Sequence, residues 1–280
     1  MYTISKENSI SGITLHSGEL SEIIVSKGEP GSGIIFNRTD VNQSISAYYD
    51  NVKNSDLSTS LTKNDISIST VEHFMAACSI LHVTDIILSV NCSELPILDG
   101  SAILFVDFIV DATLIPINYP VKKVEILKEV IVTNNNSTAM FIPNKKTIYD
   151  VQSDFEFYSG NAKWKHNSEN TLEILSSRTF GKASDLEYLR SIGLAMGASL
   201  ENVIGIGDDF EILNKFGLRS ENEIANHKLL DAIGDLYLMG YQFIGEFIGY
   251  RTGHKLNNKL LIELFSDKDN YKIVEIDSGL

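Results

Sequence analysis

The sequence repeats one order of elements in its two halves: a helix that opens on a capping-box pattern, a β-rich run and a second helix. In the first half, Ser69 and Glu72 supply the hydroxyl and, three residues later, the carboxylate of such a box. The expected elements are a helix over residues 70–81, a strand over residues 85–91 and a helix over residues 101–112. Sheet and helices in one unit indicate an α+β fold.

The second half follows the same plan. Ser220 and Glu223 form another capping box, which opens a helix that runs to about Met239. A β-like run over residues 241–250 comes next, and a last helix is expected from about Asn257. The parallel between the halves predicts two related α+β domains.

Prolines and a lysine pair near residues 113–124 mark a change in amino-acid composition between the halves. We place an N-terminal domain at residues 1–118 and a C-terminal domain at residues 124–280. Within the second domain, two strands and then a long polar loop are expected at residues 124–133, 139–142 and 159–170.

The chain is acidic. It has 23 Lys and Arg against 37 Asp and Glu, a net charge of −14, and a pI near 4.8. A general nucleic-acid binder needs a basic face, so no nucleic-acid partner is expected. A local basic pocket for one phosphorylated ligand remains compatible with this charge.

Nothing in the sequence indicates export or a membrane anchor. The N-terminus lacks a basic segment followed by an apolar one, and the most apolar stretch, residues 103–117, is interrupted by Asp107 and Asp111. Cys78 and Cys92 are expected to be free thiols. We therefore expect a cytoplasmic protein, and no feature requires more than a monomer.

The first candidate for chemistry lies on the helix of the second half. His227 and Asp231 are four residues apart and share one helix face, and Asp235 extends the same line. An imidazole and a carboxylate at this spacing can bind one zinc ion. They can also form an ordinary surface pair, but this helix is otherwise mostly apolar, so buried polar groups on it need partners.

Two further clusters are weaker by themselves. His73 is expected to face inward beside Glu72, yet a satisfied core histidine is the commoner explanation, and Glu72 already has a role as the capping-box carboxylate. Residues 251–259 (RTGHKLNNK) place a histidine and several cations at a strand-to-helix junction, which suits phosphate or oxyanion contacts or a basic solvated turn. The P-loop, zincin and serine-hydrolase motifs are all absent from the sequence.

Five segments in order resemble the motifs of the UDP-3-O-acyl-N-acetylglucosamine deacetylases, a family of zinc amidases of lipid A synthesis. They are residues 69–73 (STVEH), 94–101 (ELPILDGS), 177–181 (SRTFG), 227–235 (HKLLDAIGD) and 253–260 (GHKLNNKL). The resemblance runs from about Leu15 to about Leu264. It implies two similar α+β domains, each a small sheet layered against helices, with the active site between them.

The resemblance also implies a ligand set and catalytic roles. His73, His227 and Asp231 match the ligands of a catalytic Zn²⁺, which keeps one position open for water. The positions that match catalytic residues are Glu72 as general base, His254 as cationic acid or electrostatic stabiliser, Asp235 as the partner of His254, and Thr179 as the hydroxyl that binds the oxyanion.

Substrate contacts follow in the same way. The matching positions are Lys228 and Arg251 near the nucleotide sugar, Phe180 near the sugar, and Phe155 on the uridine side. Residues 159–170 occupy the region of the insert that forms the family's acyl-chain channel. The chain departs from the family pattern at Ser137, Phe157, Tyr158 and Lys182 and at residues 223–226, which leaves substrate affinity and channel shape open.

The resemblance therefore implies hydrolysis of the N-acetyl group of UDP-3-O-(3-hydroxyacyl)-N-acetylglucosamine, with release of acetate. Two alternatives stay open from the sequence. One is a related metal-dependent amidase that acts on another N-acetylated sugar, and the other is a zinc-binding homologue without activity.

Overall fold

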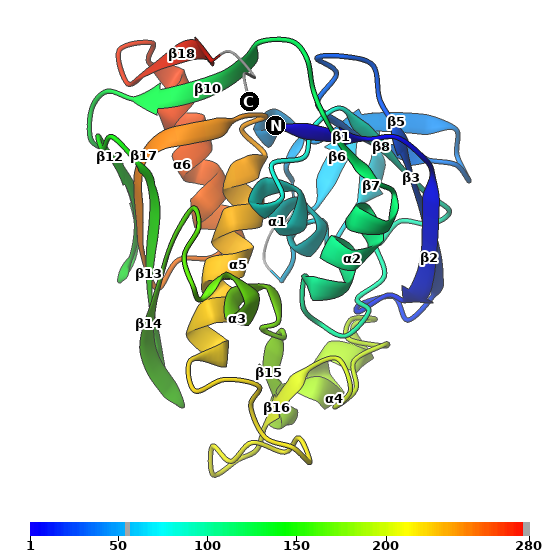
Figure 1. Cartoon of the computed structure of the whole chain (residues 1–280). Coiled ribbons are helices and arrows are strands. Elements are labelled where there is room, and N and C mark those ends of the chain that lie inside the picture. The colour runs from blue at the N-terminus through cyan, green and yellow to red at the C-terminus, as the bar shows by residue number, and fades with distance from the viewer. Residues whose placement is uncertain (54–56, 277–280) are drawn as a thin grey trace.

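Two β-sheets stand on opposite sides of the protein in the computed structural model, and the longer helices fill the space between them (Figure 1). The structure describes residues 1–53 and 57–276, so the last four residues of the predicted C-terminal domain lie outside the described residues.

The first sheet has the strand order β2-β3-β8-β4-β5. Its central strand β8 pairs antiparallel with β3 and parallel with β4, and two hairpins form the edges. Its strands are β2 (Asn8–Ile13), β3 (Leu20–Lys27), β4 (Ile34–Arg38), β5 (Gln43–Ser46) and β8 (Ile86–Val90).

The second sheet contains the same arrangement in the order β11-β12-β17-β13-β14. Here the central strand β17 pairs antiparallel with β12 and parallel with β13, and β10 and β18 extend the sheet. Its strands are β10 (Val121–Ile126), β11 (Val130–Asn134), β12 (Ser137–Ile142), β13 (Thr147–Phe155), β14 (Tyr158–Lys165), β17 (Gln242–Tyr250) and β18 (Tyr271–Ile276). The shared order confirms two similar α+β units, although the boundary at residues 118–124 stays a prediction.

The remaining strands form short pairs. They are β1 (Tyr2–Ile4) with β9 (Leu114–Pro116), β6 (Leu61–Lys63) with β7 (Ile66–Ile68), and β15 (Phe180–Lys182) with β16 (Ile204–Ile206). The last pair lies with α4 in a lobe below the two sheets (Figure 1).

Two helices, one from each unit, meet in the middle of the molecule. These are α1 (Glu72–Ile80) and α5 (Glu223–Tyr237). Helix α2 (Ile103–Asp111) packs on α1 and β2, and α6 (His254–Ser266) packs on α5, β11 and β12. The short helices are η1 (Tyr49–Asn51), α3 (Thr171–Leu175) and α4 (Ala183–Ser191).

Gly234 allows α1 and α5 to approach to backbone contact. A Cβ atom at Gly234 would lie only 2.0 Å from the carbonyl oxygen of Glu72 and 3.1 Å from the nitrogen of Ala76. Because Gly234 has no side chain, the start of α1 packs directly against the backbone of α5. This close packing brings Glu72 and His73 next to the residues of the other unit.

We expect Gly234→Ala to destabilise the protein by about 1–3 kcal/mol, because the added methyl group overpacks the contact between the two helices. In an unconstrained helix the same change would stabilise by up to about 1 kcal/mol. Chemical denaturation measures the difference. Gly181→Ala is the control, because no described atom lies within 4 Å of a Cβ there; equal stability of both variants would contradict the role of Gly234.

Neither capping box forms. Helix α1 has Val71 at its N-cap and α5 has Asn222, and no side chain of the described residues hydrogen-bonds at either cap. The backbone N–H of Ser69 donates to Ser93 O instead, Glu72 accepts from the backbone N–H of Thr59, and Glu223 accepts from Arg178. The helix positions are correct to within about three residues, but the reason for them was wrong.

The expected loop at residues 159–170 is also wrong, because most of it is strand β14. The segment is polar because β14 is an edge strand whose side chains point alternately outward and inward, and only Ala162 and Trp164 are buried. Trp164 Nε1 donates to Thr171 Oγ1 at 2.9 Å. The run at residues 124–133 is two strands, and α6 begins at His254, three residues before the expected Asn257.

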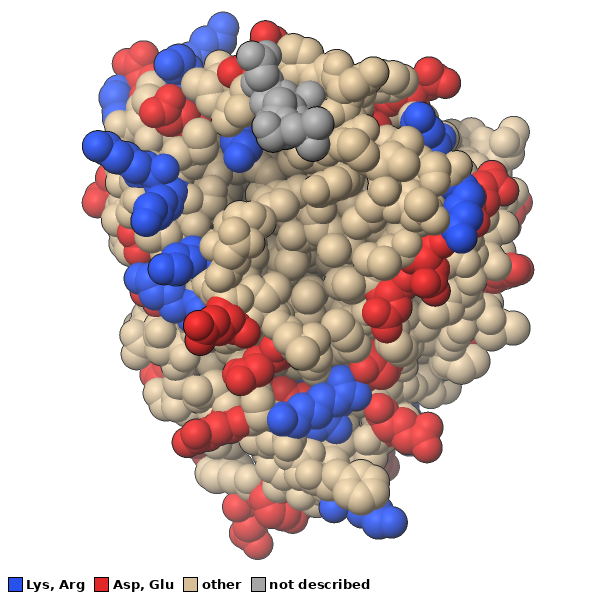
Figure 2. Space-filling model, viewed as in Figure 1, with Lys and Arg blue, Asp and Glu red and all other residues tan. Residues whose placement is uncertain are grey.

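Charged side chains are spread unevenly over the face that Figure 2 shows. Lys and Arg gather along one edge with acidic side chains beside them, while the centre of this face is mostly uncharged. Among the described residues, no helix is long and apolar enough to cross a membrane.

Candidate metal centre and active site

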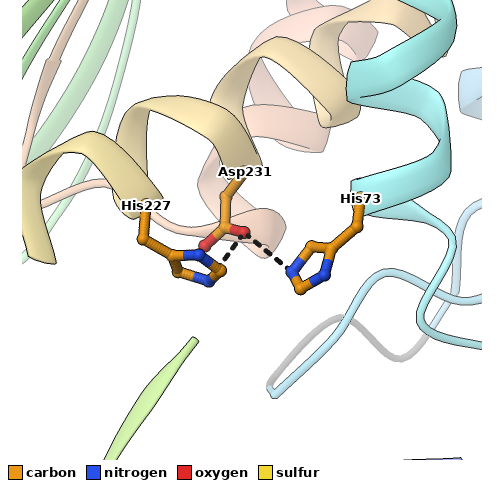
Figure 3. Close-up of side chains that lie close together, drawn as sticks. All are labelled: His73, His227 and Asp231. Carbon is orange, nitrogen blue, oxygen red and sulfur yellow. Dashed lines mark ion pairs between the residues drawn. The ribbon is translucent and has the colours of Figure 1, made fainter. Parts of the chain in front are cut away.

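The crossing of α1 and α5 brings three buried side chains together. Figure 3 shows His227 and Asp231 extending from α5 and His73 from α1 toward one point. One ligand atom from each lies within 4.8 Å of the others. Asp231 Oδ1 is 3.4 Å from His227 Nε2 and 3.7 Å from His73 Nε2.

The surroundings of these atoms fit a metal cation. His227 Nδ1 donates to the carbonyl oxygen of Ser177 at 3.0 Å, which leaves Nε2 as the lone-pair donor. Burial lowers the pKa of His227, and burial together with His227 lowers the pKa of His73 to about 3, so both rings are neutral. Within the described structure, Asp231 Oδ1 is buried without a hydrogen-bond donor. Two neutral imidazoles and an unsatisfied carboxylate oxygen form a donor set that suits zinc.

Lys228 supports the charge of Asp231. Its Nζ donates to Asp231 Oδ2 at 2.7 Å. Although burial disfavours the charge of Asp231, the Lys228 ammonium and the His254 imidazolium hold the pKa of its carboxyl well below the usual range. Asp231 therefore stays ionised, with Oδ1 directed at the two imidazoles.

Glu72 lies beside the three groups and is almost completely buried. Its Oε2 accepts a hydrogen bond from the backbone N–H of Thr59 at 3.0 Å, and its Oε1 is 3.9 Å from His254 Nε2. Burial raises the pKa of Glu72 to about 7, the range in which a carboxylate can both accept and return a proton at neutral pH.

His254, the first residue of α6, is held by Asp235. His254 Nδ1 donates to Asp235 Oδ2 at 2.9 Å, and Asn257 Nδ2 donates to the same oxygen at 2.8 Å. Burial opposes the charge of His254, but Asp235 and then Glu72 outweigh it and raise its pKa to about 9. The ring is therefore an imidazolium whose Nε2–H faces Glu72.

These groups line one pocket of about 250 Å³. Nine of the eleven positions singled out from the sequence border it: Glu72, His73, Phe155, Thr179, Phe180, His227, Lys228, Asp231 and His254. Asp235 lies behind His254. Arg251 does not line this pocket; it is exposed, with Nη1 3.6 Å from Asp154 Oδ2.

A buried ion pair fixes the segment that carries Thr179. Arg178 donates from Nε and Nη2 to the two carboxylate oxygens of Glu223, at 2.8 and 3.0 Å. Glu223 also accepts from the backbone nitrogens of Arg178 and Arg219. Burial opposes the charge, yet the Arg178 guanidinium holds the pKa of Glu223 below its usual range.

We expect Glu223→Gln to lower the free energy of unfolding by about 3–5 kcal/mol at pH 7, because Arg178 keeps a buried charge without its partner. Since the folded pKa of Glu223 lies below its unfolded value of about 4.3, the contribution is present above that pH and disappears as pH falls through the folded pKa. Denaturation of the wild type and of Glu223→Gln at several pH values should show that their difference in free energy of unfolding becomes smaller in acid. The surface pair gives the control: Asp150→Asn, which leaves Lys163, should cost less than about 1 kcal/mol.

Aromatic rings cover one side of the pocket, and two of the departures from the family pattern, Phe157 and Lys182, lie among them. Phe155 and Phe157 stack at 5.3 Å, and Phe180 meets both rings edge-on. Lys182 Nζ lies 5.7 Å from the Phe157 ring centre and 5.6 Å from that of Phe210. The unusual Phe157 and Lys182 thus contact each other through a cation–π interaction.

A second, more apolar pocket of about 490 Å³ shares Leu15, Leu57, Thr179 and Phe180 with the first. Apart from His16, its further walls come from residues 181–213, in the lobe that contains α4. Residues 159–170, which were expected to form a channel, do not line it, because β14 pairs with β13 in the second sheet.

Sequence reasoning missed several residues of the site. Thr59 and Asn257 bind Asp235, and His16 lies in the apolar pocket beside it, with both ring nitrogens buried and without a partner among the described residues. Asn257 belongs to the motif at residues 253–260. Thr59 lies in none of the five motif segments, so only the fold shows that Thr59 belongs to the site.

Comparison with known proteins agrees with the resemblance. The family model described as UDP-3-O-acyl N-acetylglycosamine deacetylase matches residues 1–266. Proteins named UDP-3-O-acyl-N-acetylglucosamine deacetylase from Hahella chejuensis and Pseudomonas entomophila are each 40% identical, over 96% and 94% of this chain and 91% and 89% of theirs. One of the same name from Brucella melitensis is 38% identical over 98% of both chains. The chain belongs to the UDP-3-O-acyl N-acetylglycosamine deacetylase family.

Proposed function

We propose that this protein is a zinc-dependent deacetylase that removes the N-acetyl group of UDP-3-O-(3-hydroxyacyl)-N-acetylglucosamine. The observation that carries the proposal is the set of His73, His227 and Asp231 in one pocket, with Glu72 and His254 facing each other beside it. A proton acceptor and a proton donor next to a metal site are what amide hydrolysis requires, because the amine is a poor leaving group.

A zinc ion held by His73, His227 and Asp231 would lower the pKa of its water to about 7 and polarise the amide carbonyl. Glu72 Oε1 takes the proton of the attacking water, since its other oxygen is occupied by Thr59. His254, kept charged by Asp235, stabilises the developing negative charge and supplies a proton to the leaving nitrogen. The hydroxyl of Thr179, which lines the same pocket, binds the oxyanion.

The substrate assignments extend this proposal outward. Phe180 and Phe155 offer aromatic faces for the sugar and the uridine, and Lys228 and Arg251 offer cations for the diphosphate. The adjoining apolar pocket in the lobe is suited to the acyl chain, because leucine, alanine and valine side chains form most of its walls.

A panel of substrates tests the assignment. Acetate release should be fast from UDP-3-O-(3-hydroxymyristoyl)-N-acetylglucosamine and should fall when the acyl chain or the UDP is removed, because remote contacts contribute to the rate. Equal rates with N-acetylglucosamine alone would indicate an amidase of another specificity. No turnover of any sugar by folded, zinc-loaded protein would favour a binding protein.

A further inference from the structure

A single buried residue, Thr59, contacts two of the carboxylates around the candidate metal centre. Its backbone N–H donates to Glu72 Oε2 at 3.0 Å, and its hydroxyl donates to Asp235 Oδ1 at 2.6 Å. Its carbonyl oxygen accepts from the nitrogen of Val71, just before α1. Thr59 is 1% exposed, so these bonds are sheltered from water. It therefore joins the start of α1 in one unit to α5 in the other.

These bonds determine which oxygen atoms remain for chemistry. Because Thr59 occupies Glu72 Oε2, it is Oε1 that faces His254 Nε2. Because Thr59 occupies Asp235 Oδ1, Oδ2 receives the bonds from His254 and Asn257. A buried carboxylate that accepts three hydrogen bonds cannot rotate without leaving a donor or an acceptor unsatisfied.

The link to Asp235 depends on the hydroxyl alone. Asn257, the other neutral donor to Asp235, is itself held by Thr252, whose hydroxyl donates to Asn257 Oδ1 at 2.6 Å. Without the Thr59 hydroxyl, Asp235 Oδ1 would be buried without its donor. The carboxylate would then turn to find another donor, and the His254 ring would turn with it.

We propose that Thr59 is a positioning residue that sets the orientation of Glu72 and of the Asp235–His254 pair relative to each other. The catalytic meaning of this coupling rests on the proposed function, but the geometry does not. The competing explanation is that Thr59 only fastens residues 57–60 to the helices.

The test uses Thr59→Val, which loses the hydroxyl but keeps the shape and the backbone N–H, and Thr59→Ser, which keeps the hydroxyl. Thr3→Val is the matched control, because Thr3 is also buried and its hydroxyl donates to Asp85 O at 2.9 Å, away from the pocket. We expect Thr59→Val to lower kcat by about 10–100-fold at unchanged zinc content, the usual cost of losing an outer partner of a site. KM should change much less, Thr59→Ser should restore kcat, and Thr3→Val should affect only stability.

Side-chain nitrogen NMR of the metal-free protein gives a readout that does not depend on activity. The His254 ring signals should shift in Thr59→Val and stay in place in Thr59→Ser and Thr3→Val. Unchanged His254 signals, or a normal kcat in Thr59→Val, would overturn the proposal. If the wild type hydrolyses no substrate, the proposed function fails, and the NMR comparison still decides whether Thr59 positions His254.

Discussion

Glu72→Gln is expected to lower kcat by about 10²–10⁴-fold, the usual contribution of a positioned general base. The amide keeps the size of the carboxylate and can still accept the N–H of Thr59, but it cannot take a proton from water. Zinc content should stay unchanged, because Glu72 is not among the three ligand candidates. Acetate release and metal analysis on the same sample measure both quantities.

Stability separates this effect from damage to the fold. Burial already disfavours the charge of Glu72, so a neutral amide should leave the melting temperature equal to or above that of the wild type. Near-normal turnover in Glu72→Gln would show that another group is the base.

Asp231→Ala is expected to remove zinc and activity together. The change deletes the one anionic ligand and leaves the partly buried Lys228 ammonium without its carboxylate, so the site disfavours a second cation. Zinc affinity should fall by more than the roughly 10–100-fold that loss of an outer partner costs. Titration of metal-free protein with zinc gives the affinity directly.

Asp150→Ala is the control for this variant. Asp150 also pairs with a lysine, Lys163, but on the second sheet, away from the pocket, so its removal should change neither zinc binding nor turnover. An Asp231→Ala protein that binds zinc as tightly as the wild type would place the metal elsewhere.

The repeated order of helix and strand was enough to predict two α+β units. In each half, the spacing of the apolar residues and the length of each run distinguish helices from strands. The first and second sheets indeed share one strand order around β8 and β17. The local sequence patterns gave wrong predictions for the capping boxes and for strand β14, where tertiary contacts decide the structure. Glu223 accepts hydrogen bonds from Arg178 and from the backbone N–H of Arg219 and does not form the expected box with Ser220. The sequence of β14 is mostly polar because only some of its alternate residues are buried.

Most residues of the site could be predicted because they lie in the five segments that resemble the family motifs. The fold brings nine of the eleven predicted positions to one pocket. Their catalytic roles stay predictions. Thr59 could not be found in this way, because its importance comes from a contact with Asp235, 176 residues away. Nor could the apolar pocket be placed, since its walls come from a lobe that carries few of the motif residues.

The central claim is that one zinc site formed by both units hydrolyses an N-acetylated UDP-sugar. The most direct measurement is acetate release from UDP-3-O-(3-hydroxymyristoyl)-N-acetylglucosamine by metal-free protein to which zinc is added in steps. The account predicts no turnover without metal and a rise that ends near one zinc per chain. Turnover that persists in the metal-free protein, or folded zinc-loaded protein that releases no acetate, would contradict it.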